Sequence, residues 1–367
     1  MESTSVEYAV RDGPPKPAGA HGTDLSVVIC TRNRAASLER TLASLARADR
    51  PDASSWEVLV VDNGSTDPTP AVISTWTDRL PLRYLFEPTP GLSAARNRAM
   101  TEARGGLLIF TDDDVEVDRG WLTALADARR RQPTAGYLAG RILPVYDDPV
   151  PSWWTDGCER LLAGVVVRFA PRRAEGLLTP EDPRPMGANL AIDAAALRTV
   201  GGFRTDLGRR GACLIGGEEV AVLIAMERAG LRGVYVPAAV VYHHTPVGRL
   251  SDLSLLRYFM GVGAAAVRMG HFPAANRFGP PRWIAPKLVR TGLAYLRHRP
   301  TGPAETWIEP MRTFGFYLGA GLERLRSALH PAASQTPTPR SAIPSSGATQ
   351  AGDESAFPRG LNAAAPA

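Results

Sequence analysis

Residues 109–115 read IFTDDDV, in which three consecutive carboxylates follow an apolar run. The run, at 106–111, is short and apolar, which is typical of a strand buried on both faces of a sheet. Adjacent carboxylates in such a place repel one another and lose hydration, and a divalent cation relieves both effects. Side chains two residues apart on an extended chain point the same way, so we predict that Asp112 and Asp114 bind one Mn²⁺ or Mg²⁺ ion. The alternative is a solvated acidic turn.

The residues before this motif alternate between apolar runs and amphipathic stretches. Strands are predicted at 25–30, 57–61, 82–86 and 106–111. Helices are predicted between them: one with Leu38, Leu42 and Leu45 on one face and Ser37 as N-cap, one from about Thr69, and one over 93–103. Repeated strand–helix–strand units predict an α/β fold with a mostly parallel sheet and helices on both faces. Such sheets bind ligands at the carboxyl ends of their strands.

The second half of the chain has a less regular pattern. Its predicted elements are a helix at 121–131, a strand at 136–143, a strand, helix and glycine turn over 187–203, a helix from about Glu218 and a strand at 233–242. Residues 144–184 are rich in Pro and Trp and are predicted to be irregular. Within them, Trp153 and Trp154 either stack on a ligand or anchor the loop.

Composition divides the chain into four segments. Residues 1–23 and 331–367 are rich in small residues and Pro, so we expect a disordered lead and a disordered tail. The α/β domain is expected over 24–247, followed by a basic helical extension over 248–330.

The charge and cysteine pattern excludes several classes of protein. The formal net charge is +5, spread without a Lys/Arg run interleaved with aromatics, so no nucleic-acid partner is expected. Cys30, Cys158 and Cys213 lack metal-binding or disulfide spacing. No secretory signal is present and no apolar run is long enough to cross a bilayer, so a cytoplasmic location is expected.

Polar residues follow the other predicted strands. Thr31, Arg32 and Arg34 come after the first strand, where backbone N–H groups and guanidinium groups suit a diphosphate; the alternative is a capped helix start with exposed arginines. Asp62 follows the second strand and can accept hydrogen bonds from a base or a ribose; the alternative is a tight turn. Arg96 stands in the first turn of a predicted helix, where the helix dipole disfavours a cation, so an anionic ligand would explain it.

Two further groups carry potential chemistry. Glu218 and Glu219 follow a glycine-rich loop and can supply a general base, or they simply pair with the dipole at a helix start. His243 and His244 follow the last predicted strand. His243 either completes the metal shell or is structural.

Seven ordered blocks together resemble the family 2 glycosyltransferases over about residues 24–247. The blocks are LSVVICTRNRAASLERTL, EVLVVDNGSTDPT, GLSAARNRAM, LLIFTDDDV, MGANLAIDAAALRTVGGF, GGEEVAVLIAMERAG and VYVPAAVVYHH. The resemblance implies a GT-A fold, in which one sugar passes from a nucleotide-diphosphate sugar to an acceptor hydroxyl by an inverting single displacement. The acceptor would be a glycan, a lipid-linked precursor or a small molecule.

The resemblance also assigns roles. Asp112 and Asp114 would be the D-x-D pair, and Glu219 would be the base with Glu218 supporting it. The remaining residues would surround the donor: Thr31, Arg32, Arg34, Asp62, Asn63, Ser65, Arg96, Asp113 and, beside the transferred sugar, Asn189.

The sequence departs from the family pattern in places. The acidic pair is commonly Glu-Asp, whereas it is Glu218-Glu219 here, and Asn63 stands where a second Asp is frequent. No Q-x-x-R-W stretch follows the acidic pair, which favours addition of a single sugar over processive synthesis. The alternative function is a non-catalytic nucleotide-sugar binding protein of the same fold.

The extension leaves two interpretations open. Its arginines and large apolar residues form either a basic amphipathic surface that contacts a membrane peripherally or helices that cover the domain. These residues are Arg257, Arg268, Arg290, Arg297 and Arg299, with Tyr258, Phe259, Trp283 and Leu288.

Overall fold

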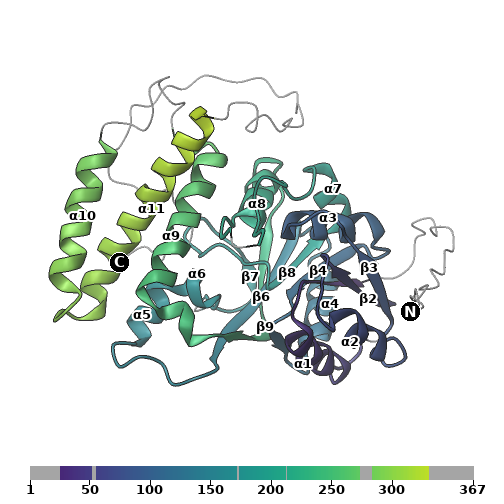
Figure 1. The fold of residues 1–367 in the computed structure, drawn as a ribbon. Coiled ribbons are helices and arrows are strands. Elements are labelled where there is room, and N and C mark those ends of the chain that lie inside the picture. The colour runs from purple at the N-terminus through teal and green to yellow at the C-terminus, as the bar shows by residue number, and fades with distance from the viewer. Residues whose placement is uncertain (1–24, 52–54, 172, 212, 273–282, 330–367) are drawn as a thin grey trace, which may run out of the picture.

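A mixed β-sheet with helices on both faces forms the centre of the protein (Figure 1). The computed structural model describes residues 25–51, 55–171, 173–211, 213–272 and 283–329. The predicted lead over 1–23 and the tail over 331–367 lie outside the described residues.

The strands lie in the order β3-β2-β1-β4-β8-β6-β9-β5, with β7 paired to β9. They are β1 Leu25–Thr31, β2 Trp56–Asp62, β3 Leu82–Phe86, β4 Leu107–Asp112, β5 Val115–Val117, β6 Tyr137–Tyr146, β7 Gly176–Leu177, β8 Asn189–Asp193 and β9 Gly233–Thr245. The first four strands are parallel, and β8 joins them to the second half through antiparallel pairs with β4 and β6.

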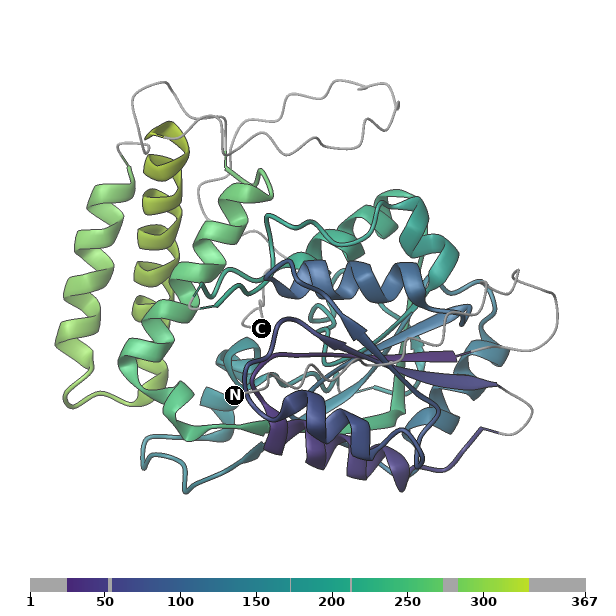
Figure 2. The same cartoon turned by 45° about the vertical axis from the view of Figure 1, so that its right-hand side comes forward.

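The helices are α1 Ala35–Ala46, α2 Thr69–Thr75, α3 Leu92–Glu102, α4 Trp121–Arg131, α5 Asp156–Leu161, α6 Ala163–Val166, α7 Ala194–Thr199, α8 Glu218–Arg228, the 3₁₀ turn η1 Val247–Leu250, α9 Asp252–Arg268, α10 Ile284–His298 and α11 Ala304–Leu329. Alternate residues of each central strand point to opposite faces. Val27 and Ile29 pack with α1, α2 and α4, whereas Val28 packs with α3, α7 and α8. The predicted parallel α/β arrangement of this half is confirmed, with a helical layer on each face (Figure 2).

Strand register brings the predicted site residues together. Thr31 lies opposite Asp62 of β2, and Cys30 lies opposite Asp112 of β4. The carboxyl ends of three strands therefore meet at one edge, as parallel pairing requires.

Two local predictions are wrong. Ser37 is not the N-cap of α1, because the helix begins two residues earlier and the Asp67 carboxylate of a neighbouring loop accepts from the backbone N–H of Ala35. His243 and His244 do not follow β9 but belong to it, because pairing with β5 and β6 extends this strand to Thr245.

Four further elements and the length of one strand were not predicted. The short strand β5 follows the acidic motif directly, β6 continues to Tyr146, and the region predicted to be irregular contains α5, α6 and β7. These elements depend on tertiary pairing, which local pattern does not encode.

The helical extension is confirmed over its described residues and packs on the α/β domain. α9 and α11 approach closely, since a Cβ on Gly263 would lie 1.9 Å from the carbonyl oxygen of Phe316. One apolar cluster joins Cys158 and Leu162 near α5 to Leu255 of α9 and Trp307 of α11. None of the helices within the described ranges is long and apolar enough to cross a membrane.

The two loop tryptophans belong to this contact. Trp153 packs edge-on against Trp307, with ring centroids 5.0 Å apart, and Trp154 packs edge-on against Trp153. This packing favours the anchoring role over stacking on a ligand.

Candidate active site

A cavity of about 600 Å³ opens at the carboxyl ends of β1 and β4. It brings together eleven of the fourteen predicted site residues. They are Thr31, Arg32, Arg34, Asn63, Arg96, Asp112, Asp113, Asp114, Glu218, Glu219 and His243.

Three potential metal ligands converge at one end of this cavity. Ligand atoms of Asp112, Asp114 and His243 all lie within 4.8 Å of one another. The prediction that the two aspartates converge is met, but the chain there is a tight turn between β4 and β5 rather than an extended strand. His243 reaches the same point because β5 pairs with β9 and places Val115 opposite His243. The donor set of two carboxylates and one imidazole fits a divalent cation.

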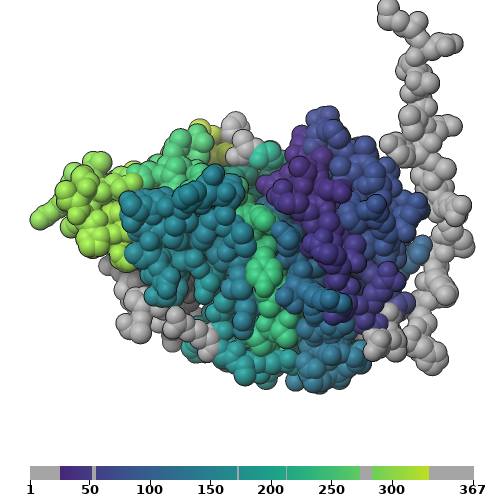
Figure 3. Space-filling view, turned by 90° about the horizontal axis from the view of Figure 1, so that it is seen from below, coloured from purple at the N-terminus to yellow at the C-terminus, as the bar shows by residue number. Residues whose placement is uncertain are grey.

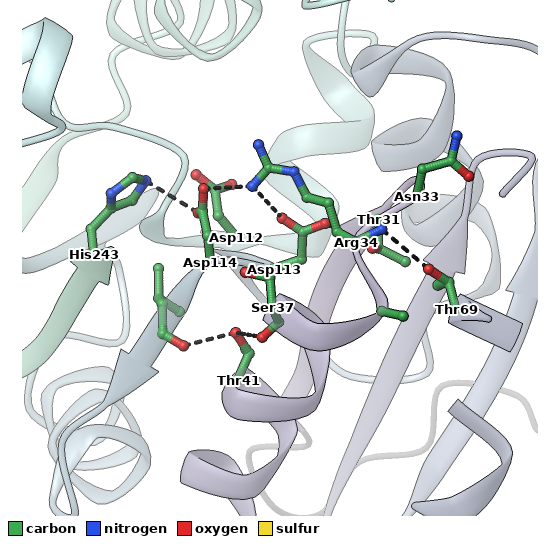
Figure 4. A network of polar contacts seen from close by, with 12 residues as sticks. Thr31, Asn33, Arg34, Ser37, Thr41, Thr69, Asp112, Asp113, Asp114 and His243 are labelled. Carbon is green, nitrogen blue, oxygen red and sulfur yellow. Dashed lines mark hydrogen bonds and ion pairs between the residues drawn. The ribbon is translucent and has the colours of Figure 1, made fainter. Parts of the chain in front are cut away.

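Arg34 and Thr31 contact the acidic turn from the α1 side. The Arg34 guanidinium donates to Asp114 Oδ2 at 2.7 Å and to Asp113 Oδ1 at 3.3 Å, and the Thr31 hydroxyl donates to Asp113 Oδ2 at 2.7 Å (Figure 4). Burial raises the pKa of Asp113 to about 7, despite the nearby Arg34 charge. Asp113 is therefore a support for its neighbours rather than a free ligand.

Asp114 pairs with three cationic or imidazole side chains, of which Arg34 has been described. Its Oδ1 lies 3.2 Å from His243 Nε2, and its Oδ2 lies 3.5 Å from Arg249. Burial opposes ionisation, but the hydrogen bond and charge of His243, together with Arg34 and Arg249, hold the pKa of Asp114 well below its usual range. The other ring nitrogen of His243 lies 3.1 Å from the Thr245 hydroxyl, which orients the imidazole.

The acidic pair Glu218-Glu219 begins α8 at another part of the cavity wall. Arg96 Nη1 donates to Glu218 at 2.8 Å, and Arg96 Nη2 lies 3.8 Å from Asp112. The guanidinium also stacks on Phe110 and Phe203. Arg96 thus lies between the two acidic clusters and neutralises part of each.

Glu219 is the less satisfied member of the pair. Its Oε2 and that of Glu218 are buried without a hydrogen-bond partner among the described residues. Burial and the neighbouring Glu218 charge raise the pKa of Glu219 to about 8. A carboxylate with a raised pKa near the cavity is suited to accept a proton.

Three predicted residues lie outside the cavity lining. Asp62 accepts from the backbone N–H of Ser65 at 2.8 Å and from the Tyr84 hydroxyl at 3.1 Å. The Ser65 hydroxyl accepts from the backbone N–H of Asn33 at 3.0 Å, which ties the loops after β1 and β2 together. Asn189 is fully engaged behind the wall, where Trp121 donates to it and its amide donates to two backbone carbonyls of β6 and β9. Their predicted contacts with a donor remain predictions.

Asn63 shapes the loop that borders the cavity. Its amide donates to the carbonyls of Glu87 and Thr89 at 2.9 and 2.7 Å, and its oxygen accepts from Gly91 N–H at 2.7 Å. An aspartate in this position has no donor for those two carbonyls.

Residues that the sequence did not assign to the site complete the wall. Tyr258, Val262 and Ala265 of α9 give the cavity an apolar side, next to Leu214. Arg209 also lines the cavity, and Arg249 reaches Asp114 from η1. No local pattern marks these residues, since they depend on how the helical extension folds back on the sheet.

Comparison with known proteins identifies the class of this chain. The sequence profile of Glycosyl transferase family 2 matches residues 26–181. The N-acetylglucosaminyl-diphospho-decaprenol L-rhamnosyltransferase of Mycobacterium tuberculosis is 32% identical over 249 residues, which cover 60% of this chain and 76% of that protein. The chain therefore belongs to glycosyltransferase family 2.

Other relatives differ in their reported activities. The succinoglycan biosynthesis protein ExoM of Rhizobium meliloti is 29% identical over 62% of this chain and 69% of its own length. The validoxylamine A glucosyltransferase of Streptomyces hygroscopicus is 44% identical over 100 residues, 27% of this chain and 24% of that protein. This chain thus spans about a quarter of the length of that relative.

A solved structure confirms the fold. The mannosyltransferase PcManGT from Pyrobaculum calidifontis, in complex with GDP-Man and Mn²⁺, aligns with a TM-score of 0.52 at 20% identity, covering 82% of this chain and 86% of that one. The predicted GT-A fold with a helical C-terminal region is therefore correct.

Proposed function

We propose that the protein transfers one sugar from a nucleotide-diphosphate sugar to an acceptor hydroxyl, by an inverting single displacement. One observation carries the proposal: a cluster of potential metal ligands and a carboxylate with a raised pKa line the same cavity. Membership in family 2 supports the same activity.

The donor diphosphate would bind beside Asp112, Asp114 and His243. When bound there, a divalent cation would offset the negative charge of the departing diphosphate. Mg²⁺ is usually held by carboxylates, waters and phosphates, so an imidazole in the donor set favours Mn²⁺. The Mn²⁺ and GDP-Man bound to PcManGT support this choice of metal and this class of donor.

The acceptor would bind on the side of Glu219. Its hydroxyl oxygen would form the new bond to the anomeric carbon as the bond from that carbon to the diphosphate oxygen breaks, and the electron pair of that bond would leave with the diphosphate. Glu219 would take the hydroxyl proton, and a single displacement inverts the anomeric configuration. Glu218, held by Arg96, would keep the base in position.

The wall formed by α9 favours an acceptor with an apolar portion. Tyr258, Val262 and Ala265 present carbon-rich surface to the cavity, and Ala265 lies close to Gly217, which precedes the acidic pair. The three free thiols support action in a reducing compartment such as the cytoplasm.

Diphosphate release separates transfer from simple binding. The protein is incubated with UDP-, GDP- and dTDP-sugars in Mn²⁺ or in EDTA, and the free nucleoside diphosphate is measured. Release that requires metal supports the transferase. Binding of a nucleotide sugar without release, in the presence of candidate acceptors, would favour the non-catalytic alternative.

A further inference from the structure

The outer helix of the extension carries an unusual amount of exposed apolar surface. α10 packs on α11 and lies at the edge of the molecule farthest from β3 (Figures 1 and 3). Val289, Leu293 and Leu296 are 62%, 62% and 66% exposed, which is more than any large apolar side chain described outside α10 and α11.

These three residues form one stripe. They are spaced four and three residues apart, which places them on one side of a helix. The opposite side of α10 faces α11, since Lys287 donates to the Tyr317 hydroxyl and Ile284 packs with Phe316 and Tyr317. The stripe, with the exposed Arg290 and Arg297 beside it, is called the outer face of α10.

The charges around this face have one sign. Arg290 and Arg297 are one heptad apart, each directly after a residue of the stripe, so they line the same edge. α10 itself contains no Asp or Glu. The remaining cations are used internally, because Arg299 pairs with Asp252 and Lys287 bonds to Tyr317.

The acids of the neighbouring helix are also engaged within the protein. Glu305 accepts from the Thr155 hydroxyl, Glu309 pairs with Arg312, and Glu323 pairs with Arg268. The outer face of α10 therefore offers apolar side chains edged by two arginines, with no acid on the same helix to oppose an anionic partner.

We propose that the outer face of α10 docks on the surface of a bilayer containing anionic lipid. Apolar side chains would enter the boundary between head groups and acyl chains, and the two arginines would reach the phosphates beside it. A second copy of the chain fits less well, because a two-fold contact of this face with itself would bring arginines together without an acid to pair them.

This surface differs from the one predicted from sequence. Tyr258 lines the cavity, Phe259 is buried in the helical cluster, and Arg268 pairs with Glu323, so these residues do not belong to it. The predicted Arg290 and Arg297 do belong to it, and the apolar part of the outer face is the stripe, which was not named among the predicted residues.

Vesicle flotation of the full chain tests the proposal. The protein is mixed with vesicles of phosphatidylcholine alone or with added phosphatidylglycerol, and the floated fraction is measured at low and high salt. We expect binding to the anionic vesicles that weakens as salt rises. Absence of binding to both kinds of vesicle would overturn the proposal.

Two variants and their matched controls locate the surface. The double variant Arg290→Gln with Arg297→Gln should lower the partition coefficient on anionic vesicles about 30-fold. Each cation near the membrane surface raises this coefficient about fivefold, and the two effects multiply. Replacing the three apolar residues of the stripe with Ser should lower it at least about tenfold. Leu177→Ser and Arg40→Gln, at exposed positions outside the extension, should leave it unchanged.

Other outcomes would contradict the proposal. Unchanged flotation of both α10 variants would place the membrane contact elsewhere. A loss of self-association in the Ser variant, measured by sedimentation velocity, would make the face an interface between copies. Nucleoside diphosphate binding by the same variants reports whether the cavity stays folded, and it keeps this test separate from that of the proposed transferase activity.

Discussion

The two ends of the cavity differ in how their carboxylates are satisfied. At the end that contains Asp112, Asp114 and His243, here called the metal end, Asp113 and Asp114 are held by Thr31, Arg34 and His243. At the other end, Glu218 and Glu219 each keep a buried oxygen that has no hydrogen-bond partner in the part of the chain that the structure describes. The metal end is arranged in advance for a charged ligand, whereas the acidic pair retains a group with a raised proton affinity. Under the proposed function, this difference would separate donor binding from proton transfer, so substitutions at the two ends should affect the two steps separately.

The largest effect is expected at the acidic pair. Glu219→Gln removes the proposed proton acceptor while keeping the size of the side chain, so the transfer rate should fall by about 10² to 10⁴. Affinity for the nucleoside diphosphate with Mn²⁺ should stay within about twofold, because the metal end is untouched. Steady-state rates and calorimetry check the two halves of the prediction.

Glu181→Gln, at an exposed position, is the matched control and should behave as wild type. If Glu219→Gln kept full activity, the base would have to be sought elsewhere.

The link between the two ends is Arg96. Its side chain and that of Glu218 are 5% and 4% exposed, so Arg96→Met would leave a buried carboxylate without its cation. The free energy of unfolding should fall by about 3–5 kcal/mol, measured by denaturant titration.

The double variant Arg96→Met with Glu218→Gln should recover much of that loss, because no buried charge is left unpaired. Equal destabilisation of the single and double variants would show that the ion pair is not the reason.

Activity should rise with pH over the range in which Glu219 titrates, whereas the stability of the folded chain should fall. The pKa of Glu219 is raised from 4.5 to about 8, so the base is largely protonated below that value and kcat/KM should rise with pH up to about 8. Between pH 4.5 and about 8, Glu219 holds its proton in the folded chain and has lost it in the unfolded chain, so the folded chain binds more protons. The stability contributed by protonated Glu219 is therefore full below about 4.5 and is lost as pH rises to about 8.

Measuring kcat/KM and the free energy of unfolding across this window checks both signs. Glu219→Gln should flatten this part of the stability profile. A stability that rises with pH in wild type and not in the variant would contradict the assignment.

The metal end was the more predictable part of the site. Asp112 and Asp114, with Thr31 and Arg34, follow buried strands of a parallel sheet, and the carboxyl ends of such strands meet at one edge. The periodicity of the chain therefore indicates where these side chains gather, although it did not predict β5 or the full length of β9.

The part of the cavity wall that the helical extension supplies could not be predicted in this way. Arg249, Tyr258 and Val262 reach the site because the helical extension folds back on the sheet, and Asn189 turns away because Trp121 and two carbonyls engage its amide. Such contacts arise from packing between segments far apart in the sequence, which residue spacing does not encode.

A smaller effect is expected where the extension supports the cavity wall. Gly263→Ala would place a methyl group 1.9 Å from the carbonyl oxygen of Phe316 and force α9 and α11 apart. We expect a loss of about 1–3 kcal/mol of stability.

Gly106→Ala, where an added Cβ meets no neighbouring atom, is the matched control for thermal denaturation. Equal melting temperatures for the two variants would mean that the contact between α9 and α11 tolerates separation.

The central claim is that Asp112, Asp114 and His243 form a metal-dependent site for a nucleoside diphosphate. Calorimetric titration of UDP, GDP and dTDP, each with Mn²⁺ or with EDTA, tests it in wild type, Asp114→Asn and the exposed control Asp148→Asn. We expect one diphosphate to bind only with metal, and its affinity to fall at least about tenfold in Asp114→Asn and not in the control. Binding that is the same in EDTA, or unchanged in Asp114→Asn, would contradict the account.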